Sequence, residues 1–226
     1  MGSTAVALKP RATYWLWSEV KNRLRQHPEF ANVWIDTFGV ARPEWAIKHP
    51  LLQQYFDTEW GRPVYDEQGL FERLSLEGFQ AGLSWLTALK KRPAFRSAFA
   101  NFDPDIVSQF SENDIDELMK NAGIVRNAQK IRAVIHNAQA TVALRSSGGL
   151  SQLIWSYQTT QPLALDSAGN PPTQTADSAA LAKKLKHRGF RFVGATTVFA
   201  MLEAIGVVNT FPFRKPHNLP MYFRGD

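Results

Sequence analysis

The 226-residue chain contains no cysteine, which excludes disulfide bonds and every metal site built on thiolates. It also lacks an apolar run long enough to cross a bilayer, and it has no charged and then apolar leader with a small-residue cleavage site. We therefore expect a cytoplasmic protein that does not enter a membrane. Apolar residues make up 44% of the chain, enough for a globular core in one domain or two interlocked lobes.

Acidic residues are missing from one long segment. Between Leu118 and Leu165 there is no Asp or Glu, although basic residues recur there. The overall charge of +6 is modest and is weak evidence for a nucleic-acid partner. A segment of one sign inside a folded domain is typical of a surface that faces phosphates, and an exposed basic face without a partner is the open alternative. The basic residues of this segment are Lys120, Arg126, Lys130, Arg132 and Arg145.

No stretch alternates convincingly enough for a strand, and no internal repeat or low-complexity segment occurs. Nearly every segment instead has helical periodicity, so we predict an all-α fold. Residues 1–41 are predicted to be an N-terminal helical extension packed on a helical body over 42–226. The extension is expected to hold helices over 13–26 and around 30–38. In the body we expect helices over 84–91, 93–99, 127–144, 150–157, 178–187 and 193–205, a capping box at 111–114, and a surface loop over 159–177.

The central stretch runs from Tyr55 to Arg92. Asp66 is a predicted helix start, because Asp accepts hydrogen bonds from free first-turn N–H groups. The following residues repeat at the spacing of one helix face, and Glu77 falls on that inward face among apolar residues. A buried carboxylate costs several kcal/mol unless it is paired or hydrogen-bonded. Tyr55, Trp60 and Trp85 are close enough in sequence to wall a flat pocket around it. The alternative is that Glu77 is a structural ion-pair partner and the aromatic residues are core.

A short turn, Asn121–Arg126, is predicted to separate two helices. Its Gly123 permits positive φ and a close approach of the backbone to a ligand. The next helix directs free N–H groups and its positive dipole end toward that ligand. With Arg126 and Lys130 beside it, the segment resembles a helix–hairpin–helix, which grips DNA phosphates, although Val125 replaces the motif's second glycine. A plain turn between helices is an equal alternative.

Together these segments resemble the DNA-3-methyladenine glycosylase I family of helix–hairpin–helix DNA glycosylases. The resemblance covers about Arg42 to Asn209 in order and with few gaps, so the extension lies outside it. It implies a fold of two helical lobes that flank a DNA-binding cleft. The matching segments are Asp57–Gly61, Leu76–Trp85, Lys90–Arg92, Asn121–Arg126 and Lys186–Gly194.

The resemblance implies an enzyme that flips a damaged base out of double-stranded alkylated DNA and cuts its N-glycosidic bond by hydrolysis. N3-methylation makes adenine a cation, which the faces of aromatic rings attract. Asn127 occupies the position of the lysine with which related enzymes form a Schiff base, so we expect no lyase activity. The family's pattern assigns the catalytic role to Glu77, the base pocket to Tyr55, Trp60 and Trp85, and the DNA contacts to Gly82 and Leu83 at the gap in the base stack and to the hairpin at Gly123 with Arg126 and Lys130.

Characterised members of the family tie their termini together with a zinc ion held by two Cys and two His. The corresponding positions here offer no usual zinc ligand, and the two nearby histidines do not complete a closed structural site. We therefore predict no zinc and no other cofactor, with an apolar contact between Phe56 and Phe211 in place of the metal. The four corresponding positions are Pro43, Phe56, Phe211 and Lys215.

The predicted function is excision of 3-methyladenine by a monomeric DNA repair glycosylase. Two alternatives stay open: a glycosylase of shifted alkylpurine specificity, and a non-catalytic protein that binds alkylated DNA. A protein that only binds has no need of the Glu77 carboxylate, which argues against the second alternative.

Overall fold

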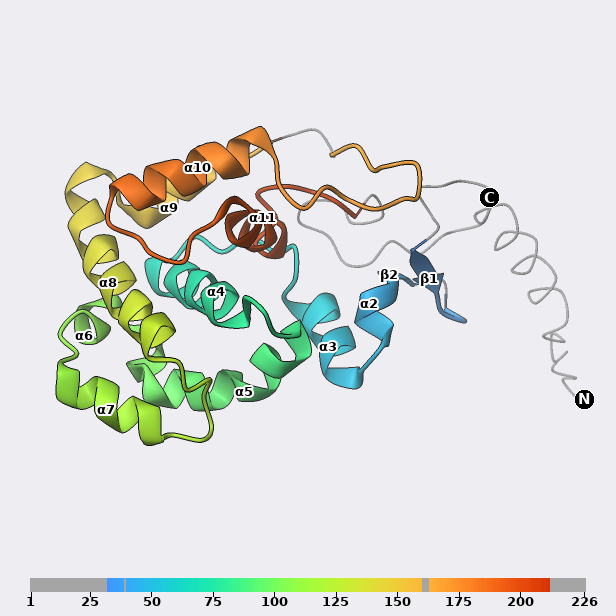
Figure 1. Cartoon of the computed structure of the whole chain (residues 1–226). Coiled ribbons are helices and arrows are strands. Elements are labelled where there is room, and N and C mark those ends of the chain that lie inside the picture. The colour runs from blue at the N-terminus through green and yellow to red at the C-terminus, as the bar shows by residue number, and fades with distance from the viewer. Residues whose placement is uncertain (1–31, 39, 160–162, 212–226) are drawn as a thin grey trace, which may run out of the picture.

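The computed structural model describes residues 32–38, 40–159 and 163–211, which form a helical body with one short β-hairpin (Figure 1). The predicted all-α class is confirmed. None of the described helices is both long and apolar enough to cross a membrane. The helices are α2 (Glu44–Ile47), α3 (Pro50–Thr58), α4 (Glu67–Gln80), α5 (Trp85–Ala98), α6 (Pro104–Val107), α7 (Glu112–Lys120), α8 (Ala128–Leu144), α9 (Gly149–Trp155), α10 (Ala176–His187) and α11 (Ala195–Ala204), with 3₁₀ turns η2 (Ala100–Phe102) and η3 (Arg145–Ser147).

Helix α4 runs through the centre of the body, with α9 and α11 packed on one side of it and α5 on the other (Figure 1). It begins as predicted, because the side chain of Asp66 accepts a hydrogen bond of 2.7 Å from the N–H of Gly69. Leu70, Phe71 and Leu74 are fully buried on this helix. The same face therefore anchors α4 in the core and carries Glu77 into it.

The N-terminal part of the described chain differs from the prediction. Val33–Ile35 is strand β1, not a helix, and it pairs antiparallel with β2, Ala41–Pro43. Asp36 closes the turn by accepting from the N–H groups of Phe38 and Val40. The strand runs are only three residues long, too short for alternation to show in the sequence. The expected helix over 13–26 lies outside the described residues.

Helix α5 is continuous, whereas two helices divided at Pro93 were predicted. Pro93 lies on the exposed face of α5, so its ring does not disturb the core. On either side of it, Arg92 and Arg96 both donate hydrogen bonds to the Glu72 carboxylate on α4. These two contacts fix the residues on both sides of the proline to one anchor, an interaction that favours a continuous helix over two separate ones.

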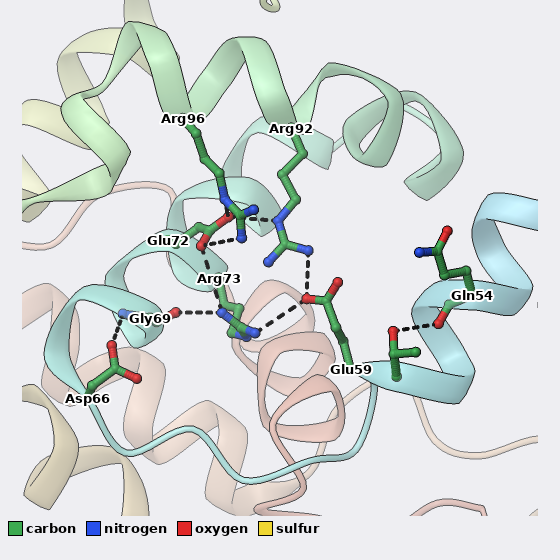
Figure 2. A network of polar contacts seen from close by, with 9 residues as sticks. Gln54, Glu59, Asp66, Gly69, Glu72, Arg73, Arg92 and Arg96 are labelled. Carbon is green, nitrogen blue, oxygen red and sulfur yellow. Dashed lines mark hydrogen bonds and ion pairs between the residues drawn. The ribbon is translucent and has the colours of Figure 1, made fainter.

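This anchor belongs to a network of ion pairs that joins α4 and α5 to the end of α3 (Figure 2). Glu72 accepts from Arg92 Nε at 2.7 Å and from Arg96 Nε at 2.8 Å, and the other end of Arg92 donates to Glu59 at 2.7 Å. Burial opposes the charge of Glu72, but the hydrogen bonds from Arg96 and Arg92 outweigh it and lower the pKa of this carboxyl. Glu72 is thus a structural carboxylate.

Candidate active site

The pocket that the sequence predicts around Glu77 exists. A cavity of about 330 Å³ lies where α2, α3, α4, the start of α5, and α11 meet. Tyr55, Trp60, Glu77 and Trp85 all line it, so the structure brings the predicted catalytic residue together with the three residues assigned to the base pocket. Its size and mainly apolar lining are typical of a small-molecule site.

Aromatic rings make up much of the wall. The ring centroids of Tyr55 and Trp85 are 5.3 Å apart, and Trp45 packs edge-on against Trp60 at 5.8 Å. Trp85 is positioned by Ser84, whose hydroxyl accepts from the N–H of Thr87 and caps α5. The indole Nε1 of Trp85 is buried and has no hydrogen-bond partner in the described part of the chain. A pocket of this kind suits a flat ring, and a cationic one most of all.

Glu77 is the unusual member of the site. The residue is only 6% exposed, yet no ion pair or side-chain hydrogen bond holds it among the residues described. Burial, together with the charge of Glu203 nearby, raises the pKa of Glu77 to about 8. The alternative role of a structural ion-pair partner therefore belongs to Glu72, five residues earlier on the same helix, and not to Glu77. A buried carboxyl with a raised pKa that faces a cavity is a strong candidate for a functional group.

The segment after α4 presents an apolar side chain beside the pocket. Gly82 has φ of 83°, a value that favours glycine, and Leu83 follows it with 40% of its surface exposed. Gln80 fixes this turn twice, since its C=O accepts from the N–H of Leu83 and its side chain donates to the C=O of Leu83. An exposed leucine on so well-held a turn is suited to fill a gap in a base stack.

The predicted hairpin connects α7 to α8, and both helix starts are capped, the first as expected and the second by a residue for which no cap was predicted. Ser111 and Asp114 form the predicted capping box of α7, and Asn127 caps α8. Gly123 does not need positive φ. It is required because a Cβ atom there would lie 2.9 Å from Ala94 Cβ on α5. Glycine thus lets the hairpin approach its own scaffold, a reason different from the one predicted.

Two lysines donate hydrogen bonds to backbone C=O groups of the hairpin and of the end of α4. Lys91, which the prediction did not single out, donates to the C=O groups of Ala122, Gly123 and Ile124 at 3.0–3.3 Å. Lys130, predicted to bind DNA, donates to the C=O groups at the end of α4, and its pKa is lowered by burial. Arg126 by contrast is exposed. The DNA contact assigned to Lys130 stays a prediction, while within the chain its ammonium caps α4.

Comparison with known proteins assigns the chain to a family. The model of the Methyladenine glycosylase family matches residues 45–212. The chain belongs to the methyladenine glycosylase family. It is 42% identical over 171 residues to the DNA-3-methyladenine glycosylase of Haemophilus influenzae, covering 74% of this chain and 92% of the relative, and 43% identical over 168 residues to DNA-3-methyladenine glycosylase 1 of Escherichia coli, covering 73% and 90%. A solved 3-methyladenine DNA glycosylase I from Staphylococcus aureus, described for its recognition of 3-methyladenine, superimposes with a TM-score of 0.71 at 38% identity over 77% of this chain and 96% of its own.

In this methyladenine glycosylase, three of the four positions predicted to correspond to the family's zinc ligands lie in the described structure. Phe56 and Phe211 pack edge-on with ring centroids 5.4 Å apart, as expected, and Ile35 and Ala41 of the β-hairpin complete the cluster around them. Pro43, Phe56 and Phe211 offer no side-chain donor to a metal. No group of three or more His, Cys, Asp or Glu with metal-binding geometry occurs in the described part of the chain, so these residues do not fit a zinc ion. Lys215 lies outside the described residues.

Sequence reasoning missed several lining residues of the glycosylase pocket. Trp45 and Lys48 come from α2 and the residue after it, and Glu203 comes from α11 more than a hundred residues later. The sequence held a signal for Glu203, since it is the only charged residue between Val193 and Thr210. That is the same anomaly that identified Glu77.

Proposed function

We propose that this protein excises 3-methyladenine from alkylated double-stranded DNA by hydrolysis of the N-glycosidic bond. The observation that carries the proposal is the buried Glu77, which has no side-chain partner among the described residues and faces a cavity walled by Tyr55, Trp60 and Trp85. The family assignment and the identity of 42–43% to two DNA-3-methyladenine glycosylases support it.

The chemistry follows from the lesion. Methylation at N3 gives the purine a positive charge and weakens its bond to the sugar, so the base leaves with little further help. A base turned out of the duplex would lie among the aromatic faces, which attract a flat cation. Glu77 would then be ionised and accept a hydrogen bond from the purine edge. A water molecule adds to the sugar carbon, one proton is released, and the base departs neutral.

The DNA contacts would come from two places. Leu83 on its fixed turn would enter the space that the flipped base leaves, and the hairpin would hold the backbone with Arg126 and the free N–H groups that begin α8. The Asn127 side chain accepts a hydrogen bond from the N–H of Lys130 at 3.1 Å as a helix cap, which agrees with a glycosylase that has no lyase activity.

The enzyme that we propose works as a monomer without zinc or any other cofactor. The support is the cluster around Phe56 and Phe211, which supplies apolar contacts where the family's zinc ligands are expected. Treatment with a strong chelator should leave both the melting temperature and base release unchanged. Stoichiometric zinc in the purified protein would contradict this part of the proposal.

The deciding experiment measures bases released from DNA treated with a methylating agent, separated by chromatography. Wild-type protein should release 3-methyladenine, and Glu77→Gln should lower the rate about 100-fold, because hydrogen bonds to charged groups contribute about 1.5–3 kcal/mol. Binding to the same DNA should fall far less. Release mainly of bulkier alkylpurines would indicate shifted specificity, and binding without release of any base would indicate a non-catalytic binding protein.

A further inference from the structure

The base pocket contains a second acidic residue. Glu203 lies in the last turn of α11 and lines the same cavity as Glu77. It is close enough that its charge contributes to the raised pKa of Glu77. We propose that Glu203 is a specificity-determining residue that makes this pocket select cationic over neutral purines. The proposal deepens the function given above and rests on it.

The contacts of Glu203 leave part of its carboxylate available to a ligand. The Thr210 hydroxyl donates a short hydrogen bond of 2.5 Å to Oε1 of Glu203, which fixes the side chain from the segment that follows α11. Within the described residues, Oε2 receives no hydrogen bond and Glu203 forms no ion pair. Thr210 is itself buried, so the contact is shielded from water. The side chain is therefore held in place but not neutralised.

The surrounding charges do not balance this acidic pair. The basic residue that lines the cavity is Lys48, whose ammonium is largely exposed and lies 3.5 Å from Glu44. Arg73 and Arg92 are close enough to Tyr55 for their charges to act on its hydroxyl, but both are bound to Glu59 in the network of Figure 2. Burial raises the pKa of Glu203 to about 7. The pocket thus holds two carboxyl groups whose ionisation is suppressed by burial. A bound cation would favour the ionised form of both.

Glu203 also lies on the boundary between two cavities. A second cavity of about 410 Å³ adjoins the base pocket, and Trp45, Lys48, Trp60 and Glu203 line both. The Glu203 side chain thus lies between the two cavities, together with Trp45 and Trp60. A charge there acts on the ring system of a bound base, where the positive charge of an N-methylated purine is spread. It has no comparable attraction for a neutral base.

The chemistry predicts which kinetic constant Glu203 controls. The positive charge is on the base before the glycosidic bond breaks and moves to the sugar as the bond lengthens. Glu77 would position the base through a hydrogen bond, whereas Glu203 would act on it through charge alone. Such a charge stabilises the bound substrate at least as much as the transition state, so the contribution of Glu203 appears in binding. Glu203→Gln should raise KM for release of 3-methyladenine about 10-fold and change kcat less than 2-fold. Gln keeps an oxygen that accepts from Thr210, so the substitution removes charge without removing the hydrogen bond.

The test compares a charged and a neutral base in the same duplex. Kinetics on methylated DNA are measured beside the affinity for a duplex that carries 3-deaza-3-methyladenine, a neutral isostere in which carbon replaces N3. Glu203→Gln should raise KM on methylated DNA, but it should change the affinity for the duplex with the neutral isostere less than 2-fold. Asp177→Asn is the matched control, since it removes an equal charge from an exposed position in the first turn of α10 and should alter neither value.

Thr210→Val separates charge from structure. It removes the hydrogen bond but keeps the carboxylate, so it should preserve the preference for the cationic base. Equal losses on both duplexes in Glu203→Gln, or no change on either, would overturn the proposal. A wild-type protein that binds methylated DNA without excising a base would refute the proposed function alone, because the affinities of wild type and Glu203→Gln for methylated DNA and for the isostere still test the role of Glu203.

Discussion

Helix α4 carries two buried carboxylates, Glu72 and Glu77, which are equally buried but differ in their partners, in the direction of their pKa shifts and in what they face. Each is 6% exposed. Glu72 is bound by Arg92 and Arg96 and its pKa is lowered, whereas Glu77 has no such partner among the described residues and its pKa is raised to about 8. The first joins two helices and the second faces a cavity. Burial alone therefore does not identify a functional carboxylate, but burial beside a cavity without a partner does.

The difference has an energetic meaning. A buried charge whose partners are present is tolerated, and it is strongly destabilising only when one partner is removed. A buried carboxyl without a partner lowers stability in the native protein itself and is retained for function. The two residues should therefore respond in opposite ways to the same substitution, and three measurements can sharpen or break this comparison.

The largest expected effect on stability is at Glu72. Replacing it with Gln leaves Arg92 buried with half of its ionic contacts, and we expect the free energy of unfolding to fall by about 3 kcal/mol. The lowered pKa of Glu72 means that its stabilisation is complete above the unfolded-state value of 4.5 and is lost as the pH falls through the folded-state value. Denaturant unfolding at pH 7 and pH 3 should show the gap between wild type and Glu72→Gln narrowing in acid. A difference in free energy of unfolding that is the same at both pH values would show that the charge of Glu72 does not cause the stabilisation.

Glu77→Gln should instead stabilise the protein. Its folded-state pKa of about 8 exceeds the unfolded value of 4.5, so the native state holds a proton that the unfolded state releases, and stability is lost as the pH rises between these values. Removing the carboxyl removes this loss. The free energy of unfolding of the variant should match that of wild type near pH 4.5 and exceed it by about 2 kcal/mol at pH 9. This difference is below the upper limit that the full pKa shift sets at about 1.36 kcal/mol per pKa unit. A variant that is less stable than wild type at pH 9 would show that Glu77 is structural.

These two residues also show how far the sequence alone leads. An acidic residue on an apolar helix face predicted the burial of Glu77, and the helix start at Asp66 and the capping box at Ser111 were predicted from local hydrogen-bonding rules. The strand Val33–Ile35 was mistaken for a helix because three residues are too few to show a period. The contacts that keep α5 continuous through Pro93 depend on Glu72, twenty residues before Arg92 in the chain, and no local pattern contains them. Glu203 shows the same charge anomaly in the sequence as Glu77, but only the fold brings α11 to the pocket, so its place in the site could not be predicted.

The smallest effect extends the comparison from anions to cations. Lys130 is bound inside the chain by the C=O groups of Phe79 and Ala81 at 2.9 and 2.6 Å, whereas Arg126 is exposed at the start of α8. If contacts within the chain mark structural charges, Arg126→Ala should lower the slope of log affinity against log salt by about 1, which is the expected loss for one phosphate contact. Lys130→Met should leave the slope unchanged and lower the free energy of unfolding by about 1 kcal/mol, because the end of α4 loses its cap.

Binding to undamaged duplex DNA between 50 and 200 mM salt measures both slopes without the flipped base. A reduced slope in Lys130→Met would mean that this lysine leaves α4 to meet a phosphate, and that the rule which separates Glu72 from Glu77 does not hold for flexible cations.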